Sequence, residues 1–535
     1  MSQSDTLGPS RNAPSASASA AASAKRQAAR LSGQVVVGGS LCAPVTATMF
    51  EVENPADLTE IGVVPRCGSE DVERAVTAAQ EAFAGWRRVS AKQRGDMLRQ
   101  VADAIQQESE ELARLLCLET GNALVTQARP EVASMVEMLR LFAGLGSELK
   151  GRTLPWEFGH LCYTTRDPLG VVAAIIPWNA PLFLTAVKLG PALMAGNTAV
   201  MKTAEQAPLA VMRSVEIMQR FLPPGVANVI SGFGAEAGKP LAEHPLVRKI
   251  TFTGSGAVGR EILRYAANKL CPVTLELGGK SPNIVLPDAD LDLVVPGILT
   301  GMRFTRQGQS CSAGSRLLVH DSVYDEVVAR VTEAMNALRV GDPMDEQSQV
   351  GAIISREQFD RIVSYVEMAR GTRGARILCG GARPQGAATE RGHFYRPTLI
   401  EGVPHESPVC QEEIFGPVAV LSRWSDFEDM LRLANGTEYG LAAAVWTRDI
   451  ARALDLVNRV EAGFVQVNQF ITPRATIAYG GLKMSGLGKE NTLESMLDHF
   501  TSSKTVLINP GTPGVFNCKR KQAAAPRSIL PDQAA

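Results

Sequence analysis

The chain has few residues suited to cross-links or metal sites. Its 535 residues include nine cysteines, an odd number with no CxxC pair, and six scattered histidines without an HExxH motif. We therefore expect neither a disulfide framework nor a structural zinc cluster, and we predict no metal site. Sparse cysteines are typical of a reducing compartment, which favours a cytoplasmic protein.

An excess of charge and long apolar runs are also lacking. The chain has 54 Lys and Arg against 55 Asp and Glu, a formal net charge of −1. Proteins that bind along nucleic-acid phosphates carry a basic excess, so we expect no nucleic-acid partner. The longest apolar candidate, Leu169 to Trp178, is too short to cross a bilayer, so we expect no membrane span. The length and the 45% hydrophobic content indicate a large core and roughly two to four domains.

Both ends of the chain are low in complexity. Residues 1–33 are rich in Ser and Ala, and we expect a disordered tail because this composition supplies no compact apolar core. The alternative is an organellar transit peptide, which is also basic, Ser-rich and acid-poor, and which would place the protein in an organelle matrix. We favour the tail because no apolar-faced helix is evident. Residues 508–535, with four prolines, predict a second tail.

Short β-branched runs alternate with helical stretches through the rest of the chain. Buried parallel strands read as continuous apolar runs, and this alternation predicts an α/β fold with doubly wound sheets. The expected strands of the first series are 171–176, 198–202, 226–230, 249–253 and 273–276, and those of the second are 283–286, 317–320, 377–379, 418–421, 441–446 and 464–467. We predict two doubly wound α/β domains with a cleft between them.

A glycine pattern lies between two of the expected strands. Residues 254–259 read GxGxxG after a strand and open a helix, with Glu276 about 20 residues further on as a candidate ribose acid. The N–H groups at the start of this helix are suited to a pyrophosphate. The pattern alone is weak evidence, because the alternative is only a tight strand-to-helix turn.

Five longer motifs change this interpretation. They are IPWNAPL at 176–182, LELGGKSPN at 275–283, QGQSCSAG at 307–314, QEEIFGPV at 411–418 and GGLKMSG at 480–486. Their order and spacing resemble the NAD(P)-dependent aldehyde dehydrogenase superfamily over roughly residues 38–507. The resemblance implies an NAD-binding domain (34–148 and 166–276), a catalytic domain (277–499) and a β oligomerisation arm (149–165 and 500–507) in a homodimer or homotetramer.

The resemblance also implies how NAD is held. Gly254 and Ser255 would approach the pyrophosphate, while Lys202 and Glu205 would hold a ribose. A carboxylate at Glu205 accepts hydrogen bonds from a 2′-hydroxyl and repels a 2′-phosphate, so NAD is expected over NADP. The other residues implied to bind the cofactor are Ile175, Pro177, Trp178, Glu413 and Phe415.

The resemblance assigns the nucleophile to Cys311. A thiolate is strongly nucleophilic near neutral pH. A free cysteine is more often a small buried hydrophobe, but the small and polar neighbours of Cys311 argue against a core position. The Asn179 side chain and the Cys311 N–H are the expected oxyanion donors. Asn179 has an alternative role as a turn residue before Pro181.

Because the resemblance assigns the ribose to Lys202 and Glu205, Glu276 is not needed to bind it. Glu276 is instead the implied general base for hydrolysis of a cysteine thioester. Its alternative is a surface acid at a strand end. Lys188 and Glu490 match positions proposed to relay protons in the family. The expected reaction is oxidation of an aldehyde to the carboxylic acid with NAD+ and water. The alternatives are a coenzyme-A-acylating relative and a catalytically dead structural relative.

The segment after Asn179 lines the substrate entrance in this family. The residues expected to line the pocket here are Ala180, Leu184, Val187 and Tyr479. Ala180 and Val187 replace aromatic residues of many relatives, which leaves room for a bulky apolar aldehyde, aromatic or medium-chain. The loop 470–474 is expected on the opposite wall, where Phe470 is either a stacking surface or a core residue. Arg306 stands where the family usually has Asn, and the sequence leaves its effect open.

Overall fold

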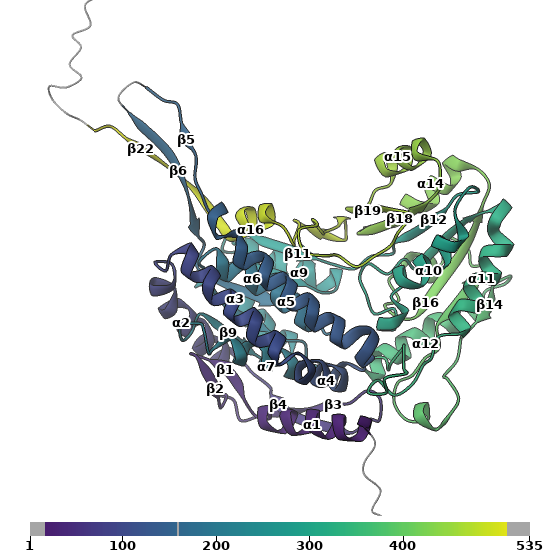
Figure 1. Ribbon diagram of the computed structural model, residues 1–535, viewed down its shortest axis with the longest axis horizontal. Coiled ribbons are helices and arrows are strands. Elements are labelled where there is room, and N and C mark those ends of the chain that lie inside the picture. The colour runs from purple at the N-terminus through teal and green to yellow at the C-terminus, as the bar shows by residue number, and fades with distance from the viewer. Residues whose placement is uncertain (1–15, 158–159, 511–535) are drawn as a thin grey trace, which may run out of the picture.

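The computed structural model describes residues 16–157 and 160–510. Two α/β bodies lie side by side, and an arm projects from one of them (Figure 1). The predictions for residues 1–15 and 511–535 lie outside the described residues. Within the described ranges, no helix is long and apolar enough to cross a bilayer. The same ranges contain no group of three or more His, Cys, Asp or Glu side chains placed to hold a metal ion.

The first body is built on an eight-stranded sheet. In chain order its strands are β1 (Val35–Val37), β2 (Ser40–Cys42), β7 (Val171–Ile175), β8 (Thr198–Lys202), β9 (Ala227–Ile230), β10 (Val247–Thr253), β11 (Val273–Glu276) and β21 (Gly486–Leu487). Their order across the sheet is β2-β1-β9-β8-β7-β10-β11-β21, and β7 to β11 run in parallel. The five strands predicted in this region are all present, with ends shifted by at most two residues.

Helices cover both faces of this sheet. They are α2 (Ser69–Trp86), α3 (Ala91–Gln107), α4 (Ser109–Thr120), α5 (Arg129–Gly144), α6 (Pro181–Met194), α7 (Leu209–Met218), α8 (Lys239–Glu243) and α9 (Gly256–Ala267). Alternate residues of β7 enter different cores: Val172 and Ala174 pack on one face, Val171 and Ala173 on the other. A strand buried on both faces has the continuous apolar sequence from which it was predicted.

The second body is built on a seven-stranded sheet. Its strands are β12 (Pro282–Val285), β13 (Arg316–His320), β14 (Arg376–Cys379), β15 (Thr398–Glu401), β16 (Val418–Trp424), β18 (Ala442–Trp446) and β19 (Phe464–Val467), and its helices include α10 (Leu291–Gly301), α11 (Tyr324–Asn336), α12 (Arg356–Gly371), α14 (Phe427–Asn435) and α15 (Ile450–Arg459). Their order across the sheet is β14-β15-β16-β13-β12-β18-β19. The six predicted strands are present, β15 is additional, and the predicted α/β class with two wound sheets is confirmed.

The chain returns to the first body before its end. Strand β21 pairs antiparallel with β11, and the following helix α16 (Leu493–Phe500) places Met496 and Phe500 in the first core. The expected range of 277–499 for the second domain is therefore too long. A two-residue strand has no sequence period that would have indicated this return.

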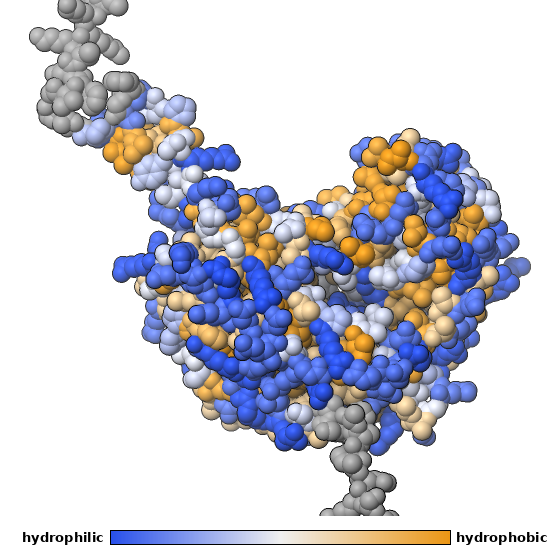
Figure 2. Space-filling model, viewed as in Figure 1, coloured by the Kyte–Doolittle hydropathy of each residue, from blue (hydrophilic) through white to orange (hydrophobic). Residues whose placement is uncertain are grey.

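The arm is a three-stranded antiparallel sheet. Strand β6 (Leu161–Pro168) pairs along its whole length with β22 (Thr501–Ile508) and near its start with β5 (Thr153–Leu154). Apolar side chains lie exposed on the arm, among them Leu154, Trp156 and Leu507, and the space-filling view shows a hydrophobic patch there (Figure 2). A role of this arm in oligomerisation stays a prediction.

The expected tail over residues 1–33 is wrong for Ala16–Leu31, which form helix α1. Ala24, Ala28 and Leu31, spaced at helical intervals, are buried in the core beside α4 and the hairpin strand β4 (Glu60–Pro65). Alanine has the highest helix propensity, and small side chains allow close packing. The composition of the whole segment concealed this narrow apolar face.

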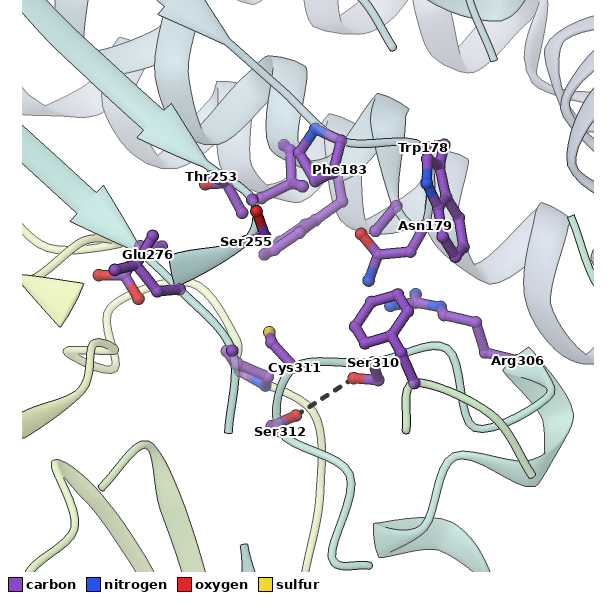
Figure 3. A pocket seen from close by; sticks show the side chains of 18 of the residues that line it. Trp178, Asn179, Phe183, Thr253, Ser255, Glu276, Arg306, Ser310, Cys311 and Ser312 are labelled. Atoms are coloured by element: carbon purple, nitrogen blue, oxygen red, sulfur yellow. Dashed lines mark hydrogen bonds between the residues drawn. The ribbon is translucent and has the colours of Figure 1, made fainter. Parts of the chain in front are cut away.

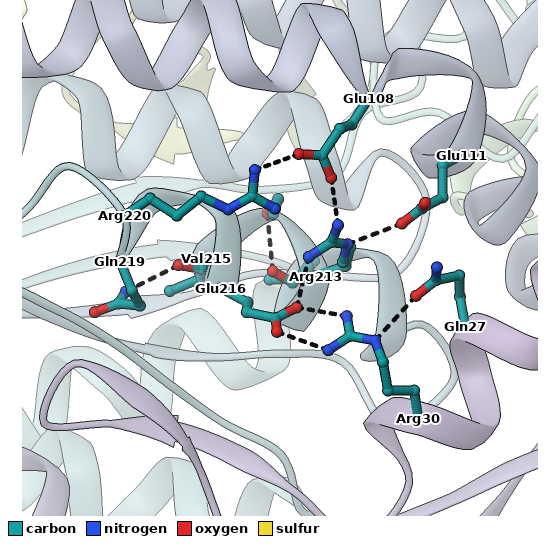
Figure 4. Close-up of polar contacts among 11 residues, drawn as sticks. Gln27, Arg30, Glu108, Glu111, Arg213, Val215, Glu216, Gln219 and Arg220 are labelled. Atoms are coloured by element: carbon teal, nitrogen blue, oxygen red, sulfur yellow. Dashed lines mark hydrogen bonds and ion pairs between the residues drawn. The ribbon is translucent and has the colours of Figure 1, made fainter.

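Ion pairs also hold α1 against the first body. Arg30 forms two hydrogen bonds with the Glu216 carboxylate on α7, at 2.7 and 2.6 Å. Arg213, also on α7, binds Glu216, Glu111 and Glu108, so that helices α1, α4 and α7 share one network (Figure 4). Networks of this kind contribute more than isolated exposed pairs.

Candidate active site

The site is formed where strands of the first sheet end. The strand order reverses between β7 and β10, and ligands bind at such switch points beside the carboxyl ends of parallel strands. Strand β7 leads into Pro177–Asn179, β10 leads into Gly254 and Ser255, and β11 ends at Glu276. The second body supplies the loop with Cys311, which follows the short helix η4 (Phe304–Arg306).

These segments enclose a cavity of about 380 Å³. Figure 3 shows the Cys311 side chain between Glu276 on one side and Asn179 on the other. The cavity brings together most of the residues predicted from the sequence: Pro177, Trp178, Asn179, Ala180, Leu184, Val187, Gly254, Ser255, Glu276, Cys311, Glu413, Phe415, Tyr479 and Glu490. The cavity lining does not include Ile175, Lys188, Lys202 or Glu205.

The predicted nucleophile, Cys311, is partly buried, and its Sγ lies 3.3 Å from the hydroxyl oxygen of Tyr479. Burial raises the pKa of the Cys311 thiol to about 11, because a thiolate is poorly solvated there. The carboxylates of Glu413 and Glu276 act in the same direction, while the Tyr479 hydrogen bond and Arg306 oppose it.

Asn179 is held beside the nucleophile loop. Its side-chain amide donates to the Gln309 carbonyl at 3.0 Å, and the residue is buried. Asn179 also lies in the turn before Pro181, the first residue of α6. The turn and the hydrogen bond together fix the amide in the cavity, so the two roles expected from the sequence are compatible.

Glu276 is a buried carboxylate at the end of β11. It is 3% exposed, and neither carboxylate oxygen has a hydrogen-bond partner within the described part of the chain. Burial raises the pKa of Glu276 well above its ordinary value, and the neighbouring Glu490 adds to this, while Lys188 and Lys489 oppose it. A carboxylate without protein donors is available to accept a proton from a ligand or water in the cavity.

Lys188 and Glu490 form a buried ion pair next to Glu276, with Nζ and Oε1 2.5 Å apart. Lys188 is on α6 and Glu490 follows β21, so the pair joins segments 302 residues apart in sequence. Thr251 on β10 also donates to Glu490 at 3.4 Å. The pair therefore lies close to Glu276, and both of its members influence the pKa of that carboxyl.

Lys202, the last residue of β8, lies beside Glu205. Their charged atoms are 3.3 Å apart, and Glu205 also accepts the Gly234 N–H at 3.2 Å. At the end of β10, Ser255 caps helix α9 by accepting the Val258 N–H at 3.4 Å. A Cβ built at Gly256 would meet open space, so the first turn of α9 can be approached closely. These residues fit a dinucleotide with its pyrophosphate over α9.

Glu413 and Phe415 come from the second body. Glu413 accepts the Gly279 N–H at 3.2 Å, and burial raises the pKa of its carboxyl to about 7. Phe415, at a positive φ of 59°, packs edge-on against Trp178 with ring centroids 5.2 Å apart. A Cβ at Gly278 would lie 2.2 Å from the Glu413 carboxylate, so a larger residue there would require the Glu413 side chain to move.

Comparisons with known proteins decide the family. The profile described as the aldehyde dehydrogenase family matches residues 43–506. The chain belongs to the aldehyde dehydrogenase family. Its members are oxidoreductases that act on aldehydes with a nicotinamide cofactor, and the resemblance seen in the sequence is confirmed.

Individual relatives match almost end to end. Retinaldehyde dehydrogenase 3 of Rattus norvegicus is 40% identical over 87% of this chain and 90% of its own length. Acetaldehyde dehydrogenase 2 of Cupriavidus necator is 40% identical over 90% of this chain and 96% of its own length. The NAD+ complex of an aldehyde dehydrogenase from Bacillus cereus superposes with a TM-score of 0.86 at 36% identity, covering 89% of this chain and 96% of that one.

Phe470 of this aldehyde dehydrogenase is a core residue. It is 1% exposed and packs against Gly301 and Gly314, where a Cβ would come within 2.4 Å of its ring. Its role as a stacking surface in the cavity is therefore wrong, and the alternative of a core position is correct. Its loop still lines the cavity through Thr472 and Pro473.

Phe183 and Arg306 are among the residues of this aldehyde dehydrogenase that line the cavity without having been predicted. Phe183 lies one helical turn before Val187 on α6, a spacing that was available in the sequence. Arg306 lies 3.7 Å from the fully buried Glu131 of α5, whose other oxygen accepts the Leu182 N–H at the start of α6. Because Glu131 faces it, the Arg306 charge is partly compensated. No local pattern indicated this pair.

A second cavity of about 380 Å³ adjoins the first. The two share Phe183, Arg306, Thr472 and Pro473. The two cavities are therefore neighbours that share part of their walls.

Proposed function

We propose that this protein oxidises an aldehyde to the carboxylic acid with NAD+ and water through a covalent thioester on Cys311. The observation that carries the proposal is the shared cavity of Cys311, Asn179, Glu276 and Glu413. The proposed nucleophile, oxyanion donor, general base and cofactor residue thus line one cavity.

In the proposed mechanism the Cys311 thiolate attacks the aldehyde carbonyl. The Asn179 amide and the Cys311 N–H stabilise the resulting oxyanion, each donor being worth about 2.7–4 kcal/mol at such sites. Bound NAD+ supplies the acceptor for the hydride that leaves the substrate carbon. Glu276 then takes a proton from water, whose oxygen attacks the thioester and releases the acid and the cysteine. Lys188 and Glu490 are placed to pass that proton onward.

Two alternatives are separated by one experiment. A coenzyme-A-acylating relative has no use for a water-activating base, so the position of Glu276 in the cavity supports hydrolysis. A catalytically dead relative would have to keep the same residues together without selection for their chemistry. Incubation with NAD+ and a set of aldehydes, with and without coenzyme A, should give NADH and free acid in both cases. A coenzyme A thioester as product, or no NADH with any aldehyde, would contradict the proposal.

We expect the cofactor to be NAD rather than NADP. Glu205 lies beside Lys202, which it partly neutralises, and is suited to accept hydrogen bonds from a 2′-hydroxyl. Charge-assisted hydrogen bonds contribute about 1.5–3 kcal/mol, so kcat/KM should favour NAD by roughly tenfold to a few hundredfold. Glu205→Gln should narrow the ratio, while Glu243→Gln on the surface of α8 should leave it unchanged. A wild-type enzyme that prefers NADP would refute this.

We expect a preference for bulky apolar aldehydes. Ala180, Leu184 and Val187 leave an apolar space in the cavity that holds Cys311. Each buried CH₂ contributes about 0.8 kcal/mol, so hexanal and benzaldehyde should exceed acetaldehyde by well over tenfold in kcat/KM. Betaine aldehyde should also be poor, because the aromatic side chains that many relatives have at the positions of Ala180 and Val187 are absent. One relative is named for retinaldehyde and another for acetaldehyde, so both sizes belong in the measurement.

Val187 provides the direct control on this preference. Val187→Trp should lower kcat/KM for hexanal and benzaldehyde more than for acetaldehyde, because the indole fills the apolar space. Val187→Ala, which enlarges it, should keep the large substrates. Unchanged activity of Val187→Trp on large aldehydes would show that the side chain at this position does not restrict the apolar space beside Cys311.

We also propose a homodimer or homotetramer assembled through the arm, whose exposed Leu154, Trp156 and Leu507 support pairing between subunits. Sedimentation of the full chain tests this. The cytoplasmic location stays a prediction.

A further inference from the structure

The hydroxyl of Tyr479 is in contact with the predicted nucleophile. Its oxygen lies 3.3 Å from the Cys311 Sγ. The residue is 8% exposed, and its ring packs edge-on against Phe464 with centroids 5.6 Å apart. Its backbone pairs with Glu490 in an antiparallel bridge. Ring and backbone are thus both fixed, so the hydroxyl is directed at the sulfur by the fold.

The direction of this hydrogen bond follows from the surroundings. Burial raises the pKa of Tyr479 well above its ordinary value, and the nearby Glu276 adds to this. The phenol therefore keeps its proton and acts as a donor. The nearby Ser312 side chain acts in the opposite direction and lowers the tyrosine pKa.

A thiolate at Cys311 needs such a donor. Among the charged groups that act on the sulfur, the carboxylates of Glu413 and Glu276 disfavour the thiolate and Arg306 favours it. Tyr479 is the side chain that hydrogen bonds to Sγ in the described part of the chain. Its donation lowers the pKa of the thiol against the effect of burial.

We propose that Tyr479 is a catalytic residue whose hydroxyl donates to the Cys311 sulfur and stabilises the attacking thiolate. The thiol S–H bond breaks and its proton leaves to a base in solution, while the Tyr479 O–H bond stays intact. The inference rests on the proposed role of Cys311 as nucleophile and adds to the role of Tyr479 as a wall of the substrate pocket.

Alkylation of Cys311 by iodoacetamide in the absence of cofactor tests the proposal. The rate is measured at several pH values below the thiol pKa, with the modified cysteine identified by peptide mass spectrometry. The rate there follows the fraction of thiolate. A hydrogen bond to a charged group is equivalent to about one to two pKa units. Tyr479→Phe should therefore slow alkylation about 10–100-fold at every pH, and kcat/KM should fall in the same range.

A steric effect of Tyr479→Phe would raise the alkylation rate instead of lowering it. The substitution removes one atom from beside the sulfur and would only improve the access of iodoacetamide. Tyr324→Phe is the matched control: it deletes another buried hydroxyl, which donates to Glu401 at 2.8 Å in the second body. It should leave Cys311 alkylation unchanged. Tyr479→Leu also removes the hydroxyl, should slow alkylation in the same range, and provides a second variant if Tyr479→Phe does not fold.

An alkylation rate unchanged or increased in Tyr479→Phe, or in Tyr479→Leu if only that variant folds, would overturn the proposal. Failure of the proposed role of Cys311 as nucleophile can be distinguished from failure of the proposed role of Tyr479. If Cys311 were not the nucleophile, Cys311→Ala would keep its activity whatever the Tyr479 variant does to alkylation.

Discussion

Replacement of Cys311 with alanine should abolish turnover while NAD binding survives. Without the sulfur there is no nucleophile to form the covalent intermediate, and loss of such a residue lowers kcat by on the order of 10⁴-fold or more. The residues that fit the dinucleotide, Lys202, Glu205 and Ser255, are held by contacts that do not involve Cys311. Turnover is measured as NADH formation, and NAD binding by calorimetry.

A second cysteine serves as the control. Cys42 on β2 is also a partly buried free thiol, but it is in the first sheet and does not line the cavity. Cys42→Ala should keep both activity and NAD binding. Near-normal turnover in Cys311→Ala would exclude the covalent mechanism.

Glu276→Gln should slow hydrolysis of the thioester by roughly 10²–10⁴, the usual contribution of a positioned base. The amide has the size of the carboxylate but accepts no proton from water. Since Glu276 acts after hydride transfer in the proposed mechanism, the variant should release one burst of NADH per active site and then turn over slowly. Rapid-mixing absorbance measurements would record both phases.

The rate of thioester hydrolysis should rise with pH. Burial and Glu490 raise the pKa of Glu276, so the carboxylate that acts as base becomes more abundant as pH rises. Thioester hydrolysis by the wild type should therefore accelerate with pH until Glu276 is fully ionised, and Glu276→Gln should lose that acceleration.

Hydroxylamine provides a chemical control for the Glu276 variant, because it attacks a thioester without needing a base to activate it. It should restore turnover of Glu276→Gln and leave Cys311→Ala inactive. Loss of the NADH burst to the same degree as the steady state would assign Glu276 to an earlier step than hydrolysis.

Much of the framework was predictable from local sequence. The strands β8, β11 and β19 were predicted with the ends that the structure has, because strands buried on both faces appear as unbroken apolar runs. Glu276 ends one such strand and Asn179 comes shortly after another, so their motifs also indicated the edge of the sheet on which they lie. The cavity confirms that these segments meet, and their chemical roles stay proposals.

Other features could not be read from local patterns. Helix α1 was missed because Ala24 and Ala28 give only a faint apolar face, which becomes significant once α4 and β4 lie against it. Phe470 had two possible positions, and the space above Gly301 and Gly314 decided for the core. The partner of Arg306 is Glu131, on a helix far away in sequence.

The sequence by itself determined the α/β class, the two wound sheets and the family, because these depend on periodicity and on motifs a few residues long. Only the tertiary structure decided which side chains meet: Lys188 with Glu490, Arg306 with Glu131, and the Tyr479 hydroxyl with the Cys311 sulfur. Tyr479 and Cys311 are 168 residues apart, and no local period records their distance. The physical reason is that side-chain contacts depend on how whole elements pack, whereas strand and helix formation depends mainly on near neighbours.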